Sequence, residues 1–118
     1  MKPGDVVLIR LPDATSDAPK LRPALILAML PGSFQSLLIC GISTQLRDLQ
    51  PNWDETIGPS DVDFPSSGLH RLSAIRLSYL YAAASHEIAG RIGRLREERL
   101  ERLCQRLINI LTVTHTAA

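Results

Sequence analysis

The sequence predicts a single α+β domain in which a small, strongly curved β-barrel or sheet carries one helix packed against it. Short runs of β-branched and aliphatic residues, separated by turn-forming residues, fill most of the chain. A stripe of apolar residues with helical spacing follows near its end. A chain of 118 residues is long enough for one domain with a modest core, so we assign residues 1–118 to one domain.

Three strands are expected first. DVVLIRL, residues 5–11, is rich in β-branched and aliphatic residues and is bounded by glycine and proline. A polar, turn-rich loop over residues 12–20 leads to RPALILAM, residues 22–29, in which Pro23 begins the strand and removes no ladder hydrogen bond. SLLICGIS, residues 36–43, is almost continuously apolar, which indicates that both of its faces are covered.

Residues 46–68 differ in composition from the strands before them. The segment is rich in Pro, Ser, Asp and Gly, and we expect a long loop with one short strand over residues 53–57. Loops of this length in small domains are often functional. Further strands are expected over residues 74–77 and 79–82, followed by a short strand or a link over residues 89–95.

REERLERLCQRLINIL, residues 96–111, predicts the helix. Glu97 and Glu98 lie in its first turn, where negative charge is favourable to the helix dipole. Arginines on the outer side could contact RNA, but a solvated face with a Glu98–Arg102 pair is the better interpretation. We expect residues 114–118 to be a frayed tail. The apolar stripe is Leu100, Leu103, Cys104, Leu107, Ile108 and Leu111, and the outer arginines are Arg99, Arg102 and Arg106.

Composition excludes several classes of protein. The formal net charge of +1 excludes an overwhelmingly basic nucleic-acid binder, although it is compatible with a local basic patch. The longest apolar runs, such as ALILAML, are too short to span a bilayer. MKPGD at the start lacks the apolar centre of a signal peptide. We therefore expect a cytoplasmic protein without a membrane partner.

The two cysteines, Cys40 and Cys104, are interpreted as buried, reduced thiols, because each lies among apolar residues and no CxxC spacing occurs. A catalytic cysteine would need a partner histidine, and nothing in the sequence points to one. There is also no P-loop, GxGxxG, HExxH or zinc-type spacing. The sequence therefore supports neither a metal nor another cofactor.

Several stretches, taken in order, resemble the MazF/PemK family of toxin endoribonucleases. They are KPGDVVLI, LRPALIL, CGISTQ, LSAIRLSYLY and the terminal helix. The family pattern is a G-D-x-hydrophobic strand, an R-P-hydrophobic strand, a third strand ending in Thr or Ser near a glutamine, an I-R strand and a C-terminal helix. Each motif is weak alone, and their order over nearly the whole chain carries the resemblance.

The resemblance implies an SH3-like β-barrel with helices, as in PemK/MazF/CcdB-like folds, usually forming a homodimer. It implies the toxin of a type II toxin–antitoxin system, which cleaves single-stranded RNA, often mRNA, without a metal. Attack by the 2′-hydroxyl would leave 2′,3′-cyclic phosphate and 5′-OH ends. The implied protein partner is a small antitoxin that covers the RNA groove.

The resemblance assigns catalysis to Arg22 and Ser43, with Thr44 as a close substitute in the hydroxyl role. The residue before a proline favours extended backbone, so Arg22 has a restrained position at the entrance to a strand. Its guanidinium can donate a fork of hydrogen bonds to phosphate oxygens on which negative charge develops. Arginine is a poor base near neutral pH, so the general base is left unassigned. The alternative is structural, with Arg22 paired to Asp5 or Asp17.

Two departures from the family leave the proton transfers open. Arg76 matches the family's I/V-R position and is a candidate RNA contact, as is Ser78, which stands where some relatives have an acid thought to act as base. Some relatives have a histidine in the first loop, whereas this chain has only acids there, among them Asp17. Asp17 is a candidate base, although a loop acid is more often only solvated.

RNA binding also needs cationic and stacking surfaces. Lys20 and Gln45 are further candidates, and Gln45 could read a base edge or bond only to backbone. Trp53, in the long loop, could stack on a base or anchor its loop onto the core, and both interpretations stay open.

Two alternative functions use the same fold. The gyrase-poisoning CcdB relatives act through C-terminal residues that include a tryptophan, whereas this chain ends in TVTHTAA and has no tryptophan after Trp53. The other alternative is a degenerate member that binds without cleaving. Ser43 in place of the commoner threonine, and Ser78 in place of an acid, keep that alternative open.

Overall fold

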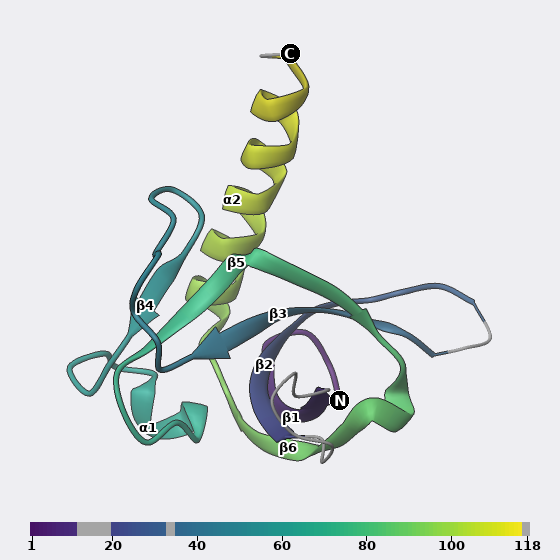
Figure 1. Cartoon of the computed structure of the whole chain (residues 1–118), viewed down its shortest axis with the longest axis vertical. Coiled ribbons are helices and arrows are strands. Elements are labelled where there is room, and N and C mark those ends of the chain that lie inside the picture. Colours follow the sequence, from purple (N-terminus) through teal and green to yellow (C-terminus); the bar gives the residue numbers. More distant parts are fainter. Residues whose placement is uncertain (12–19, 33–34, 117–118) are drawn as a thin grey trace.

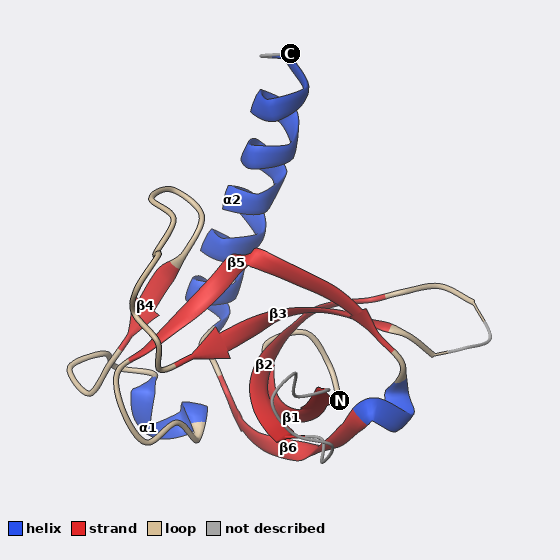
Figure 2. Ribbon diagram, viewed as in Figure 1, coloured by secondary structure: helices blue, strands red, loops and turns tan. Residues whose placement is uncertain are grey.

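The computed structural model describes residues 1–11, 20–32 and 35–116 and has the predicted order of strands followed by a helix (Figure 1 and Figure 2). The elements are β1 (Asp5–Leu11), β2 (Lys20–Met29), β3 (Leu37–Ser43), β4 (Glu55–Ile57), α1 (Phe64–Ser67), β5 (Ser73–Ala83), the 3-10 helix η1 (Ser85–Glu87), β6 (Ile88–Arg94) and α2 (Glu97–Thr116).

The strands form one six-stranded antiparallel sheet in the order β4-β5-β3-β2-β1-β6. Figure 1 shows the sheet curling strongly through β2, β1 and β6. The α+β class is therefore confirmed. The expected barrel is not closed, however, because β4 and β6 are the edges of the sheet and no pairing joins them in the described part of the chain. A barrel closes only when its two edge strands pair with each other. The edge strand β4 has only three residues, and the pairing recorded for them is with β5.

The prediction of two strands over residues 74–82 was wrong, because Ser73–Ala83 form the single strand β5. Its pairing with β3 is irregular. Cys40 pairs with Leu80, but the next residue, Gly41, pairs with Arg76. Three residues of β5, Leu77–Tyr79, therefore have no partner in β3 and form a bulge. Residues 64–67 form the short helix α1, which the sequence analysis did not predict.

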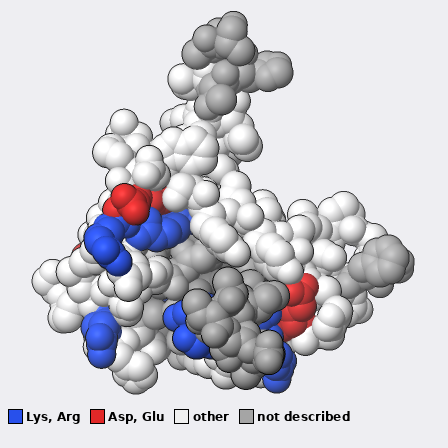
Figure 3. Space-filling model, viewed as in Figure 1, with Lys and Arg blue, Asp and Glu red and all other residues white. Residues whose placement is uncertain are grey.

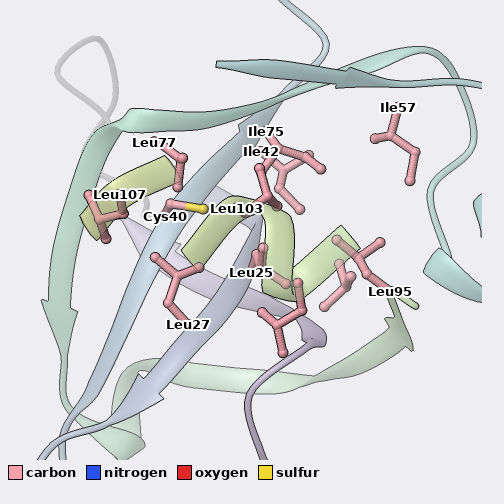
Figure 4. Packing of buried hydrophobic residues seen from close by; sticks show 12 residues of the cluster. Leu25, Leu27, Cys40, Ile42, Ile57, Ile75, Leu77, Leu95, Leu103 and Leu107 are labelled. Carbon is pink, nitrogen blue, oxygen red and sulfur yellow. The ribbon is translucent and has the colours of Figure 1, made fainter. Parts of the chain in front are cut away.

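Both faces of the central strands are covered, as predicted for residues 36–43. Along β2, Leu25 and Leu27 belong to the cluster that contacts α2, whereas Ala24 and Ile26 belong to a second cluster on the opposite face. Figure 4 shows the larger cluster, in which Leu103 and Leu107 of α2 pack over the sheet. Cys40 is buried within it as a free thiol, and Cys104, also free, is partly buried at its edge.

Helix α2 is longer than predicted. It extends to Thr116, so residues 114–116 are helical rather than frayed, and the last two residues lie outside the described part. The first half of the apolar stripe is buried, at Leu100, Leu103 and Leu107. The second half is not, with Ile108 56% and Leu111 62% exposed, because α2 projects beyond the sheet (Figure 1). None of the described helices has both the length and the apolar character needed to cross a bilayer.

The prediction that Arg99 lies on the outer side of the helix was wrong, and so was the predicted Glu98–Arg102 pair. Arg99 is 7% exposed, and its Nε lies 2.7 Å from Asp63 Oδ2 in a bond that joins α2 to the start of α1. Glu55 of β4 accepts hydrogen bonds from Arg99, Arg102 and Arg106 at 2.7 to 3.0 Å. Glu98 instead pairs with Arg96. These acids are distant in sequence, so the periodicity of the helix could not reveal them.

Candidate functional site

A pocket of about 540 Å³, which we call the groove, brings together several of the predicted site residues. They come from β2, the end of β3 and β5. Pairing of Ala24 with Gly41, and of Gly41 with Arg76, aligns these three strands side by side. Arg22 and Ser43 each lie two residues from that aligned row, at the same end of β2 and β3. The groove is lined by Arg22, Ser43, Thr44, Gln45 and Arg76, together with Ile9, Pro23, Gly41, Ile42 and Tyr79.

Arg22 is exposed in the groove and forms no hydrogen bond or ion pair with any other described residue. Its backbone lies opposite Ile9 of β1, so the guanidinium extends from a paired strand. The alternative pairing with Asp5 was wrong, because the Asp5 carboxylate bonds Arg94 at 2.9 Å and Arg91 at 3.1 Å. Asp17, the other suggested partner and candidate base, lies outside the described residues. Arg22 can therefore present its donors to a ligand.

The hydroxyl of Ser43 is oriented by the chain that follows it. The backbone N–H of Gln45 donates to Ser43 Oγ at 3.0 Å, in a turn that serine commonly forms. Because Oγ accepts this bond, its own proton is free to be donated into the groove. Thr44 is exposed beside it and provides a second hydroxyl.

Arg76 also lines the groove, but its guanidinium is directed into the loop after β3. It donates to the carbonyl oxygens of Gln45 at 2.6 Å and Arg47 at 2.9 Å, and to Asp54 Oδ2 at 3.3 Å. Its side chain is 16% exposed. Such a fork of donors suits several carbonyls at once. Arg76 therefore organises residues 45–54 and has few donors left for a ligand.

Ser78 does not line the groove, and its polar groups already have a partner. Its hydroxyl lies 2.8 Å, and its backbone N–H 3.1 Å, from Asp54 Oδ1. Asp54 also accepts from the backbone N–H of Gln50 at 3.0 Å, and its side chain is fully buried. The sequence analysis missed Asp54, because an aspartate in a turn-rich loop is usually solvated and its partner in β5 lies far away in the chain.

Tyr79 also lines the groove, although the sequence analysis did not select it. A Cβ built on Gly41 would lie 3.2 Å from ring atom Cδ1 of Tyr79, so the ring lies against the glycine. The Tyr79 side chain is nevertheless 47% exposed. Tyr79 lies in the bulge of β5, and no local sequence pattern encodes that bulge.

Two other candidates lie away from the groove. Trp53 lines a different pocket of about 500 Å³ with Arg106, Asn109 and Ile110 of α2. Lys20 is exposed at the first position of β2. Neither is among the residues that line the groove with Arg22.

The described lining of the groove contains two arginines and no acid or histidine. Figure 3 shows Lys and Arg side chains at several places on the viewed face of the molecule. Such a groove favours an anion, and a phosphate could accept from the Arg22 guanidinium and from the two hydroxyls. In residues 1–11, 20–32 and 35–116, no group of three or more His, Cys, Asp and Glu side chains is arranged to hold a metal ion.

Comparison with known proteins finds similarity both to a sequence family and to solved structures. The model of a family described as the PemK-like, MazF-like toxin of type II toxin–antitoxin systems matches residues 2–111. The fold is similar to the solved structure of the Mycobacterium tuberculosis toxin MazF-mt6, with a TM-score of 0.67 and 18% sequence identity, over 92% of this chain and 96% of that one. At this identity the structural likeness supports the fold alone. No curated protein sequence matches this chain significantly.

Proposed function

This chain belongs to the family of PemK-like, MazF-like toxins of type II toxin–antitoxin systems, and we propose on that basis that it is an endoribonuclease that cleaves single-stranded RNA in the groove. The observation that carries the proposal is the guanidinium of Arg22, unpaired among the described residues, beside the hydroxyls of Ser43 and Thr44. RNA and mRNA in particular are the expected substrates, because members of the family are usually endoribonucleases.

The proposed reaction is attack by a ribose 2′-hydroxyl on the adjacent phosphorus. The new O2′–P bond forms as the P–O5′ bond breaks, which gives a 2′,3′-cyclic phosphate and a 5′-OH end. The 2′-hydroxyl loses a proton to a base, and the leaving O5′ gains one. Negative charge develops on the non-bridging oxygens, where a fixed cation and hydroxyl donors lower the barrier.

We propose that Arg22 stabilises the negative charge on the non-bridging oxygens. Ser43 is the first hydroxyl donor to these oxygens and Thr44 is the second. The bond from the Gln45 N–H to Ser43 Oγ supports this order, because it restrains the position of the Ser43 hydroxyl oxygen. A preorganised donor needs no reorganisation as the charge forms. Removal of one such donor typically costs about 100-fold or more in rate.

The other predicted RNA-contact residues have separate proposed roles. Gln45 lines the groove and is the candidate for contact with a base edge. Arg76 is proposed mainly to hold the loop over residues 45–54, with Ser78 in the same structural role. Lys20 and Trp53 lie outside the groove and would contact only a longer RNA. Asp17 stays the candidate base of the first loop.

We propose a cognate antitoxin as the protein partner, as the toxin–antitoxin family implies, and a cytoplasmic location. A homodimer is also proposed. The exposure of Ile108 and Leu111 on the projecting end of α2 supports it, because apolar side chains at such a position gain from burial against a second subunit.

The decisive experiment is digestion of a long single-stranded RNA in EDTA by the wild type and by Arg22→Ala. We expect fragments with 2′,3′-cyclic phosphate ends from the wild type and a loss of about 100-fold or more in the variant. Arg71→Ala is the matched control, because Arg71 is exposed and does not line the groove. Equal cutting by wild type and Arg22→Ala would refute the assigned site.

A second candidate function is RNA binding without cleavage. It is favoured by one observation, the lack of any acid or histidine among the described groove residues. Wild-type protein that binds RNA through Arg22 but releases no fragments would establish this alternative.

A further inference from the structure

We propose that Tyr79 is a stacking platform for one base of the bound RNA, and that the bulge in β5 positions it beside Arg22. The inference rests on the proposed function, since it assigns a nucleobase subsite within the same groove. Nothing in the order of motifs along the chain points to Tyr79; the pairing of the strands does.

The bulge is the first step of the argument. In an uninterrupted ladder, the pair Cys40 with Leu80 would be followed by Gly41 with Tyr79, but Gly41 pairs with Arg76 instead. Leu77, Ser78 and Tyr79 are thus released from β3. Bulges of this kind redirect side chains and occur often beside functional sites. The Tyr79 ring lies against Gly41 at the groove, while its backbone is released from the ladder with β3.

The residues before Tyr79 hold the bulge in a fixed shape. Leu77 is completely buried in the core beneath α2. Ser78 is bound through both its hydroxyl and its backbone N–H to the buried Asp54. With Leu77 buried and Ser78 bound to Asp54, the backbone that leads into Tyr79 has little freedom of movement. A ring that is held before the ligand arrives loses little entropy on binding.

The chemistry of the exposed ring points to a base. Tyr79 is 47% exposed, and its hydroxyl forms no hydrogen bond with another described residue. Glycine at position 41 provides the space for the ring, because a Cβ there would be 3.2 Å from Cδ1. The groove thus offers an aromatic surface next to a cation and two hydroxyls, which matches a base attached to its phosphate.

The experiment measures binding separately from cleavage. The probe is a short, fluorescein-labelled, random-sequence RNA pool with every 2′-hydroxyl methylated, so that it cannot be cut, and the readout is fluorescence anisotropy. Tyr79→Ala is expected to weaken binding about 10-fold, which is the size of effect found when one base loses its aromatic partner. Tyr79→Phe keeps the ring and is expected to bind as the wild type does.

Two further variants test whether the aromatic face and the position of the ring are what matter for binding. Tyr79→Leu retains apolar volume without an aromatic face, so it covers Gly41 and is expected to bind as weakly as Tyr79→Ala. Gly41→Ala displaces the ring by a few tenths of an ångström while leaving Tyr79 present, and an intermediate loss of affinity is expected. Circular dichroism and thermal unfolding identify any variant that has lost its fold.

The outcomes separate this inference from the proposed function. Binding that is lost in Arg22→Ala but unchanged in both Tyr79→Ala and Tyr79→Leu would overturn the platform and leave the groove as the RNA site. Equal loss in Tyr79→Phe and Tyr79→Ala would also overturn it, since the hydroxyl rather than the ring would then be the contact. A wild type that binds none of the pool would overturn the proposed function together with the platform.

Discussion

The buried carboxylate of Asp54 accepts two hydrogen bonds from Ser78, one from its hydroxyl at 2.8 Å and one from its backbone N–H at 3.1 Å. Asp54 belongs to the loop before β4, and Ser78 belongs to the bulge of β5. The contact therefore joins the loop that borders the groove to the strand segment that carries Tyr79. The acid that contacts position 78 thus comes from a different part of the chain.

Asp54→Asn is predicted to destabilise the protein by about 1 to 3 kcal/mol. Backbone N–H groups, the Ser78 hydroxyl and Arg76 all donate to this carboxylate. An amide replaces one accepting oxygen with a donor, which leaves buried donors unmatched. Urea unfolding measures the change, and Asp48→Asn is the control because the Asp48 side chain is exposed. Equal stability of both variants would contradict the assigned role.

Arg76→Lys is predicted to lose most of what Arg76→Ala loses, both in stability and in resistance of residues 45–54 to proteolysis. Arg76 contacts the carbonyls of Gln45 and Arg47 as well as Asp54, and a lysine ammonium cannot span the same set. The expected loss of stability is about 1 to 2 kcal/mol. A variant with unchanged stability and protease resistance but weaker RNA binding would show that Arg76 acts mainly on the ligand.

Arg99→Ala is predicted to destabilise the protein by about 3 kcal/mol or more, because it leaves Asp63 buried without its partner. Guanidinium denaturation of Arg99→Ala and of Arg96→Ala makes a matched comparison. Arg96 pairs with an exposed acid on the surface and is expected to matter little. Equal losses of stability in the two variants would mean that the buried Arg99–Asp63 pair stabilises the protein no more than a surface pair does.

Stability is predicted to fall as the solution is acidified below about pH 5. Burial by itself would raise the pKa of Asp63 and of Glu55, but hydrogen bonds and charge from Arg99 and Arg102 hold both pKa values below the usual 3.8 and 4.5. Because these pKa values are lower in the folded state, the unfolded chain binds protons at a higher pH than the folded protein does. The stabilisation is complete above the unfolded pKa values and disappears as pH falls through the folded ones.

The pH dependence is checked by denaturant unfolding across this range. Asp63→Asn should be less stable than the wild type at neutral pH and should show a shallower decline on acidification. An unchanged slope in this variant would mean that Asp63 contributes nothing to acid sensitivity.

Cys40 is predicted to be inert toward thiol reagents in the native protein. Burial raises the pKa of its thiol to about 12, so hardly any thiolate forms near neutral pH. Cys104 is only partly buried and should be the one thiol that reacts slowly before unfolding. Native Cys104→Ser should therefore show no reaction with Ellman's reagent, whereas rapid labelling of that variant would contradict the burial of Cys40.

The strands before residue 43 and the terminal helix could be predicted because their signals are local. Aliphatic runs between turn residues define β1, β2 and β3, and helical spacing defines α2. The order of the motifs also selected Arg22, Ser43, Thr44, Gln45 and Arg76, which the structure brings to one groove. Asp54 and Tyr79 were missed because each acquires its role from a partner far away in the sequence.

The sequence by itself determined the fold class, the order of elements and the side chains available for chemistry, since residue type and spacing report how each segment meets water and core. Only the tertiary structure decided how these side chains are used. It gave the Arg22 guanidinium no partner within residues 1–11, 20–32 and 35–116, whereas it tied Arg76 to a loop and buried Arg99 against Asp63. An arginine's role depends on which carboxylates and carbonyls come within hydrogen-bonding distance, and chain pairing and packing set those distances.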